Sequence, residues 1–251
     1  MATDMVSHDI PQERLLELRP CVDHVVTEDD TPVDSIFSEK QQRLLTEPLF
    51  SSWAAEGEKR TFVALANVGL FYSVRQPPFV PDVLLSLDVE LPPDVHPKPF
   101  RSYFLWEYGK PPDVVIEVVS NREGGEDADK LAGYARIGVK YYVIFDPDCL
   151  LSDQLLRPFR LEAGGYRDMA GPIWLPCAGL GLQLWQGRFE DVDDTWLRWV
   201  DKQGRPIPTG AERAEREQAR AEREQARAVR EQARAERLME QLRRLGAEPE
   251  V

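Results

Sequence analysis

Three side chains in the middle of the sequence have the types that hydrolysis of a phosphodiester requires. Asp82 stands at the start of one apolar segment, Glu117 lies inside another, VVIEVV, and Lys130 follows in a more polar stretch. A carboxylate within an apolar strand is costly unless it is paired or bound to a metal ion. Phosphodiester hydrolysis uses a hard divalent cation held by oxygen ligands and a positive group that steadies the attacking water. Together these residues have the chemistry of a metal-dependent site.

Three short apolar segments, each ended by polar residues, are predicted to be the strands around this site. They are VPDVLLSLDVEL, PPDVVIEVVS and KYYVIFDP. The second and third are separated by EDADKLAGYARIG, whose apolar residues recur at helical spacing. A strand, a helix and a further strand in succession predict a parallel or mixed sheet with helices packed on it, which is the α/β class.

The predicted helix between the second and third strands carries Lys130. Tyr134 is four residues further on, so both side chains project from one helical face and could point over the strand ends. Asp127 or Asp129 can cap the start of the helix, and Gly138 ends it. A solvated Lys130 and a Tyr134 that only packs in the core are the alternatives to a functional role.

Further elements are predicted on both sides of this core. Ser38 and Gln41 have the spacing of a capping box ahead of an apolar pair, which predicts a first helix beginning at Ser38. The pair Gly164-Gly165 marks a hairpin. Additional strands are predicted within residues 61–74, 154–169 and 180–191.

The last part of the chain is a heptad repeat. The heptet AEREQAR begins at Ala214 and recurs with small changes. The seam is formed by alanines, glutamines and one methionine, which predicts a solvated helix or a weak coiled coil. Favourably ordered pairs three residues apart are predicted to stabilise it: Glu217 with Arg220, Glu224 with Arg227, and Glu231 with Arg234. Leu238, Leu242 and Leu245 are candidates for weak self-association.

These patterns divide the chain into four predicted parts. They are an N-terminal arm at 1–37, an α/β domain at 38–195, a linker at 196–210 and a heptad-repeat helix at 211–246.

The composition limits the function. The chain has 251 residues with 42% hydrophobic content, enough for one core and an appended segment. Its net charge of −13 argues against a broad basic surface for nucleic acid, so a nuclease would depend on a local site. The three cysteines form no C-x-x-C pair, and no run of ~18 apolar residues occurs. We therefore expect a cytoplasmic protein.

The ordered series VPD, PPDVVIEVVSN and DADKLAGYARIGVKYYVIFDP resembles the Uma-two family of restriction-endonuclease-like proteins, over roughly residues 38–186. That family is placed in the PD-(D/E)xK nuclease superfamily, which implies a restriction-endonuclease-like mixed sheet flanked by helices. The resemblance implies that Asp82 and Glu117 bind Mg²⁺ or Mn²⁺. Val119 stands where the superfamily pattern has its lysine, and the resemblance implies that Lys130 takes its place.

Two weaker site candidates follow from the same comparison and from position. The superfamily often uses an acid on its first helix, and Glu39 is the candidate here, with Glu47 behind it. Ser120 follows the strand of Glu117 and either ends that strand or touches a substrate phosphate.

Three functional hypotheses follow. The first is a metal-dependent endonuclease acting on DNA, in which a homodimer would provide two sites for double-strand cutting. The second is a catalytically inactive protein with a nuclease fold that binds a partner through its C-terminal helix; the acidity of the domain favours it. The third is a metal-dependent step on a small phosphorylated or nucleotide ligand.

Overall fold

The computed structural model describes residues 35–53, 60–122 and 125–244. The chain divides into two compact units, residues 1–207 and residues 208–251, which are described separately. The predicted arm at 1–37 lies outside the described residues except for its last three, as does Cys21.

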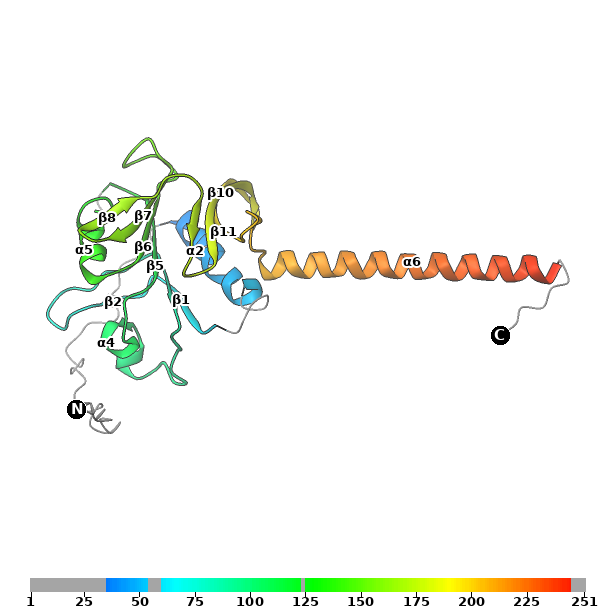
Figure 1. The fold of residues 1–251 in the computed structure, drawn as a ribbon, viewed down its shortest axis with the longest axis horizontal. Helices are drawn as coiled ribbons and strands as arrows, with labels where there is room; N and C mark the ends of the chain where they lie inside the picture. Colours follow the sequence, from blue (N-terminus) through cyan, green and yellow to red (C-terminus); the bar gives the residue numbers. More distant parts are fainter. Residues whose placement is uncertain (1–34, 54–59, 123–124, 245–251) are drawn as a thin grey trace, which may run out of the picture. The chain divides into compact units, whose positions relative to one another are not determined.

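A six-stranded sheet forms the centre of the first unit (Figure 1). Its order is β1-β3-β5-β6-β7-β8, and β5 and β6 are its one parallel pair among the described strands. The strands are β1 Phe62–Ala66, β3 Val83–Leu87, β5 Val114–Val118, β6 Tyr141–Phe145, β7 Leu156–Glu162 and β8 Gly165–Asp168. Helix α5, Asp129–Ile137, connects β5 to β6. The expected mixed α/β sheet is therefore confirmed.

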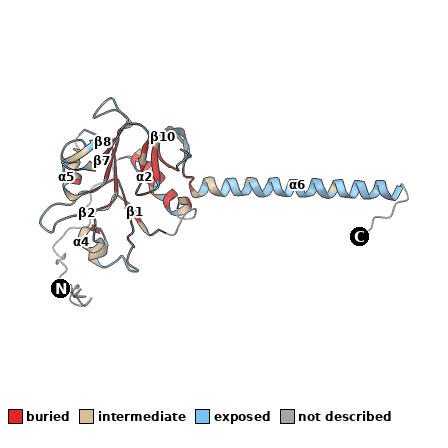
Figure 2. Ribbon diagram, viewed as in Figure 1, coloured by how far each residue is buried: buried red, intermediate tan, exposed pale blue. Residues whose placement is uncertain are grey.

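Apolar residues cover both faces of this sheet. On β5, Ile116 and Val118 belong to a cluster with helix α2, Ile36–Pro48, and with a second sheet. Val115 belongs to a cluster on the other face that includes Tyr134 of α5. Glu117 alternates with Ile116 and Val118 along the strand, so its side chain lies on the α5 face. The buried segments of Figure 2 follow these strands and α2.

Smaller elements complete the first unit. The second sheet has the order β11-β10-β9, and a parallel pair joins β2 to β4. Their bounds are β2 Leu70–Phe71, β4 Tyr103–Phe104, β9 Ile173–Leu175, β10 Leu180–Phe189 and β11 Val192–Val200. The remaining turns are a π-helix at Leu49–Trp53, a 3-10 helix at Lys98–Phe100 and α4 at Leu105–Tyr108.

The first helix begins earlier than predicted. Its N-cap is Ser35, whose side chain accepts a hydrogen bond from the backbone N–H of Ser38. Gln41 does not complete a capping box, because its amide exchanges hydrogen bonds of 2.8 and 2.9 Å with the backbone of Leu197 in β11. The predicted capping box is thus wrong, since a buried strand 156 residues away competes for the Gln41 side chain.

The predicted caps of α5 have mixed outcomes. Its N-cap is Ala128, with no side-chain hydrogen bond from Asp127 or Asp129 to the cap. Asp127 instead lies 3.7 Å from Arg157. Gly138 ends the helix as predicted, with a φ of 91° that favours glycine.

The predicted linker at 196–210 is wrong in its first residues. Residues 196–200 are the end of β11, where Trp196, Leu197 and Trp199 are buried. Phe189 pairs with Val192, and the two residues between them have positive φ, so β10 and β11 form a tight hairpin. The apolar side chains of β11 bury against α2, and this holds the segment in the domain.

The second unit contains α6, Gly210–Arg244, which has no buried residue. Thr209 and Glu212 form a capping box at its start, with hydrogen bonds of 2.8 and 3.1 Å. Three of its ion pairs join an arginine to the glutamate four residues after it, as in Arg220–Glu224 and Arg227–Glu231, and Arg244 pairs with Glu240, four residues before it. The predicted three-residue pairs are therefore wrong, because the four-residue spacing is the one that these rotamers use. Residues 245 and 246 lie outside the described part.

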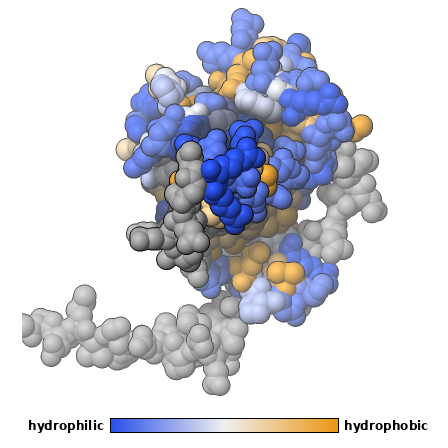
Figure 3. All heavy atoms as spheres, turned by 90° about the vertical axis from the view of Figure 1, so that its right-hand side faces the viewer, coloured by the Kyte–Doolittle hydropathy of each residue, from blue (hydrophilic) through white to orange (hydrophobic). Residues whose placement is uncertain are grey.

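In the described residues, no helix is both long and apolar enough to cross a membrane. The end-on view in Figure 3 shows a largely hydrophilic surface on this side.

Candidate metal-binding site

The central strands bring Asp82 and Glu117 together. In the antiparallel pairing of β3 and β5, Val83 is opposite Ile116, which places Asp82 beside Glu117. The backbone N–H of Val118 donates to Asp82 Oδ2 over 2.7 Å. Asp82 is 7% exposed and Glu117 is 1% exposed. Two buried carboxylates from neighbouring strands therefore share one site.

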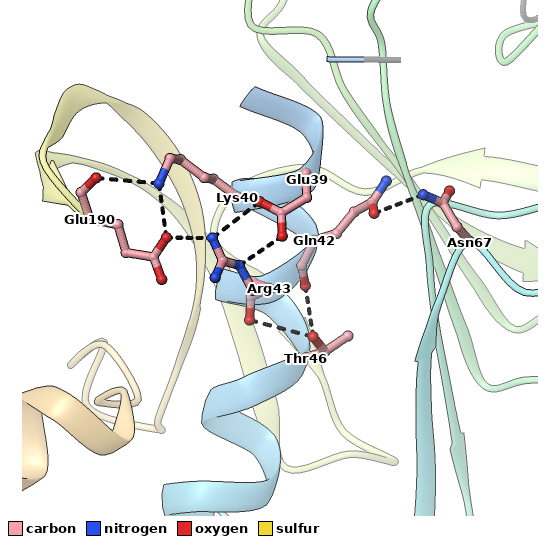
Figure 4. Close-up of polar contacts among 7 residues, drawn as sticks. All are labelled: Glu39, Lys40, Gln42, Arg43, Thr46, Asn67 and Glu190. Atoms are coloured by element: carbon pink, nitrogen blue, oxygen red, sulfur yellow. Dashed lines mark hydrogen bonds and ion pairs between the residues drawn. The ribbon is translucent and has the colours of Figure 1, made fainter. Parts of the chain in front are cut away.

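The position of Asp82 is also fixed from α2. Gln42 Nε2 donates to Asp82 Oδ1 over 2.7 Å, and Asn67 Nδ2 donates to Gln42 Oε1 over 3.0 Å. Figure 4 shows the amides of Gln42 and Asn67 directed toward each other. Asn67, at the end of β1, has a φ of 52° and also donates its backbone N–H to the Asp82 carbonyl. Two amide side chains that the sequence did not single out thus orient the first acid.

Helix α5 fixes the position of Glu117. Tyr134 donates its hydroxyl to Glu117 Oε1 over 2.6 Å, and Lys130 Nζ donates to Glu117 Oε2 over 2.9 Å. The two helical residues are one turn apart and face the strand, as the sequence predicted. Every oxygen of the two acids therefore accepts one protein hydrogen bond and keeps a lone pair.

Glu126 is a third buried acid that sequence analysis missed. Its Oε1 lies 3.2 Å from Lys130 Nζ, and its backbone carbonyl accepts a hydrogen bond from Tyr142. Its Oε2 is buried without a hydrogen-bond partner in the part of the chain that the structure describes. The signal was present, because Glu126 and Lys130 have the four-residue spacing of a helical ion pair. Lys130 is thus held between two carboxylates.

Burial dominates the electrostatics of this cluster. It raises the pKa of Glu117 to about 8; Lys130 acts in the opposite direction, and the negative charge of Asp82 adds to the rise. Burial also raises the pKa of Asp82, against the hydrogen bond from Val118. Burial acts to lower the pKa of Lys130, but the carboxylates of Glu117, Glu126 and Asp82 together outweigh it and the pKa is raised. Three buried acids surround one ammonium group, so protons or a divalent cation must balance the excess negative charge.

The donor set fits a hard divalent cation. Mg²⁺ is usually held by one or two carboxylates and keeps several water ligands. Asp82 and Glu117 match that pattern and provide no nitrogen or sulfur ligand of the kind that zinc prefers. Among the described residues, no group of three or more His, Cys, Asp or Glu is placed to hold a metal ion. A two-carboxylate site completed by water and substrate oxygens is therefore the arrangement that these residues fit.

The two weaker candidates lie elsewhere. Glu39 pairs with Arg43 over 2.9 Å, and Arg43 also binds Glu190. Figure 4 shows this ion-pair group on a different side of α2 from Gln42, the α2 residue that contacts Asp82. Ser120 is half-buried and lines a pocket of about 360 Å³ that also includes Asn121.

Comparison with protein families gives a match. The Uma2 family model, described as "Putative restriction endonuclease", matches residues 22–184. This range includes both acids and Lys130. No curated protein matches the chain.

Proposed function

We propose that this chain, which belongs to the Uma2 family, is a divalent-metal-dependent endonuclease that hydrolyses phosphodiester bonds in DNA. The observation that carries the proposal is the pair of buried carboxylates, Asp82 and Glu117, with the ammonium group of Lys130 at 2.9 Å from the second. Family membership supports a nuclease. We infer the metal ion from the chemistry of the site, and the DNA substrate from the family's description as a restriction endonuclease.

Each residue of the site has a role in this proposal. Asp82 and Glu117 would hold Mg²⁺ or Mn²⁺, which when bound supplies a Lewis acid and an activated water. Lys130 orients the water and stabilises the charge that develops on the phosphate. Tyr134 holds Glu117 in its rotamer through the 2.6 Å hydrogen bond. Gln42 does the same for Asp82 over 2.7 Å. Ser120 remains a weaker candidate, for a phosphate contact, whereas Glu39 pairs with Arg43 on another side of α2 and has no role in this proposal.

Cutting both strands of a duplex requires two such sites. We propose that a homodimer provides them, since one chain contains a single pair of these acids. The exposed apolar residues Leu238, Met239 and Leu242 of α6 are the candidates for contacts between copies.

A second candidate function is supported by a different observation. Helix α6 has no buried residue, so its exposed side chains are accessible to a partner. A catalytically inactive protein with a nuclease fold could use this helix for binding alone.

Metal titration and plasmid cleavage on the same samples test the proposal. Titrate Mg²⁺ and Mn²⁺ by calorimetry into the wild type and into the Asp82→Asn and Glu117→Gln variants, with Glu162→Gln, an exposed acid, as control. We expect metal-dependent cleavage by the wild type and the control, with losses of at least ~10³-fold in both site variants. Failure of the wild type to bind metal, or cleavage retained by both site variants, would refute the proposal.

A further inference from the structure

Helix α6 carries a continuous stripe of arginines. Arginines recur in alternating steps of three and four residues, with Gln241 as the one interruption. Nine of the ten arginines in the helix belong to this stripe: Arg213, Arg216, Arg220, Arg223, Arg227, Arg230, Arg234, Arg237 and Arg244. We call it the arginine stripe. Such spacing keeps all nine side chains along one side of an α-helix.

The arginine stripe contains no acidic residue. At about 100° per residue, its centre lies roughly 160° from the seam of alanines and glutamines that begins with Ala214 and Gln218. Six of the eight glutamates lie on the flanks, in two rows represented by Glu217 and Glu222, roughly 80° and 120° from the centre of the stripe. The other two, Glu212 and Glu240, lie near the two ends of the helix. A surface that approaches this side of the helix therefore meets guanidinium groups first.

Part of the stripe is already paired with the flanking acids. Arg220 and Arg227 each contact a glutamate four residues later over 2.9 Å. Arg216, Arg223 and Arg230 are exposed, and within the described chain they form no ion pair. These three point along one row, so they can make new contacts without breaking an existing one.

We propose that the arginine stripe binds the phosphate backbone of duplex DNA. The choice of DNA rests on the proposed function. Arginine presents several donors in a rigid fork that matches phosphate oxygens. From Ala211 to Leu245, ten arginines against eight glutamates give +2, so the rest of the chain carries −15 and repels DNA. The stripe thus provides the attraction that the acidic body lacks.

The length of the stripe fits an extended, rigid partner. From Arg213 to Arg244 it spans about 46 Å at 1.5 Å per residue. This exceeds one turn of B-form duplex, about 34 Å. Duplex DNA presents one charge per ~1.7 Å along its axis, so the row of guanidinium groups can meet several phosphates together. A second copy of this chain would instead use the opposite seam, where small side chains allow close approach.

The test measures binding without cleavage. Full-length protein in EDTA is titrated into a fluorescent 30-base-pair duplex by anisotropy, at several salt concentrations between 50 and 200 mM. The stripe variant carries Arg216→Gln, Arg223→Gln and Arg230→Gln. The charge-matched control carries Arg160→Gln, Arg188→Gln and Arg205→Gln, three exposed arginines of the body. Circular dichroism verifies that both variants keep their helix, which glutamine supports.

We expect the stripe variant to bind on the order of 10- to 100-fold more weakly at low salt. The slope of the logarithm of the binding constant against the logarithm of the salt concentration should become less steep by about 2 to 3, since each lost phosphate contact removes ~0.9 from it. The control should bind within about twofold of the wild type. Wild-type affinity in the stripe variant, or an equal loss in the control, would overturn the proposal. Equal competition by single-stranded RNA would overturn the assignment to duplex DNA.

The two proposals can fail separately. If DNA binding depends on the stripe arginines but the protein cleaves no DNA with any metal ion, the proposed nuclease function is refuted and the arginine stripe remains a binding surface. If the protein cleaves DNA with metal and the stripe variant binds DNA normally, the proposed role of the arginine stripe is refuted and the nuclease function stands.

Discussion

The acidic site of the body and the arginine-rich helix use the same kind of ion pair in opposite environments. Lys130 and Glu117 lie 2.9 Å apart with side chains 22% and 1% exposed. Arg220 and Glu224 are also 2.9 Å apart, but their side chains are 79% and 65% exposed. Distance therefore does not distinguish the two pairs, and burial does.

This difference has energetic consequences. Breaking a buried pair leaves an uncompensated charge away from water, whereas an exposed pair is replaced by water and salt at little cost. A buried cluster with excess negative charge also favours binding of a cation, and an exposed helix with balanced charges favours solubility and reversible contacts. Exclusion of water from the charged groups therefore distinguishes the candidate site from the exposed ion pairs of α6. Four experiments test how far this holds.

The largest effect is expected for Lys130→Met. The substitution keeps most of the side-chain volume and leaves Glu117 and Glu126 without their cation. We expect the free energy of unfolding to fall by about 3–5 kcal/mol at pH 8, measured by urea denaturation without metal. Lys40→Met is the control, since Lys40 also lies 2.9 Å from its partner, Glu190, which is 38% exposed. We expect the control to lose less than ~1 kcal/mol, and equal losses would contradict the comparison.

The next effect is a pH dependence that originates in Glu117. Its pKa rises from 4.5 to about 8 on folding, so between these values the folded chain holds a proton that the unfolded chain has lost. Stability of the metal-free protein should therefore fall as pH rises through this window, by on the order of a few kcal/mol. Urea denaturation across pH 5–9 measures it, and Glu117→Gln should flatten the curve. An unchanged slope in that variant would assign the effect to another group.

A smaller effect is expected for Glu126→Gln. The variant removes one of the two carboxylates that hold Lys130, so the ammonium group should be less well placed. We expect cleavage to fall about 10-fold in kcat with KM little changed, as for a positioning residue. Asp127→Asn, the neighbouring acid paired with Arg157, is the matched control. Wild-type kcat in Glu126→Gln would show that Glu117 alone holds Lys130.

The smallest effect is expected in α6. Glu224→Gln removes one exposed ion pair, so we expect the free energy of unfolding of the helix to change by no more than ~0.5 kcal/mol. Thermal unfolding followed by circular dichroism at 222 nm measures this change. A loss of several kcal/mol would mean that this helix is packed against a partner in solution.

The sequence alone determined what depends on near neighbours. The segments around Asp82 and Glu117 read as strands because apolar residues cluster there, and α6 reads as a helix because its heptads repeat. The shared face of Lys130 and Tyr134 followed from their four-residue spacing. The types of three site residues, two acids and a lysine, indicated the chemistry before their distances were known.

Tertiary structure decided the contacts between distant segments. Gln42 donates a hydrogen bond to Asp82, 40 residues further along the chain. Gln41 bonds the backbone of Leu197, 156 residues away, and therefore does not form the predicted capping box. Burial of β11 against α2 converted the start of the predicted linker into a strand. Glu126 joined the site because Lys130 of α5 pairs with its carboxylate and Tyr142 of β6 donates a hydrogen bond to its backbone carbonyl. Periodicity reflects neighbours within about one helical turn, whereas which polar group loses its water depends on how whole elements pack.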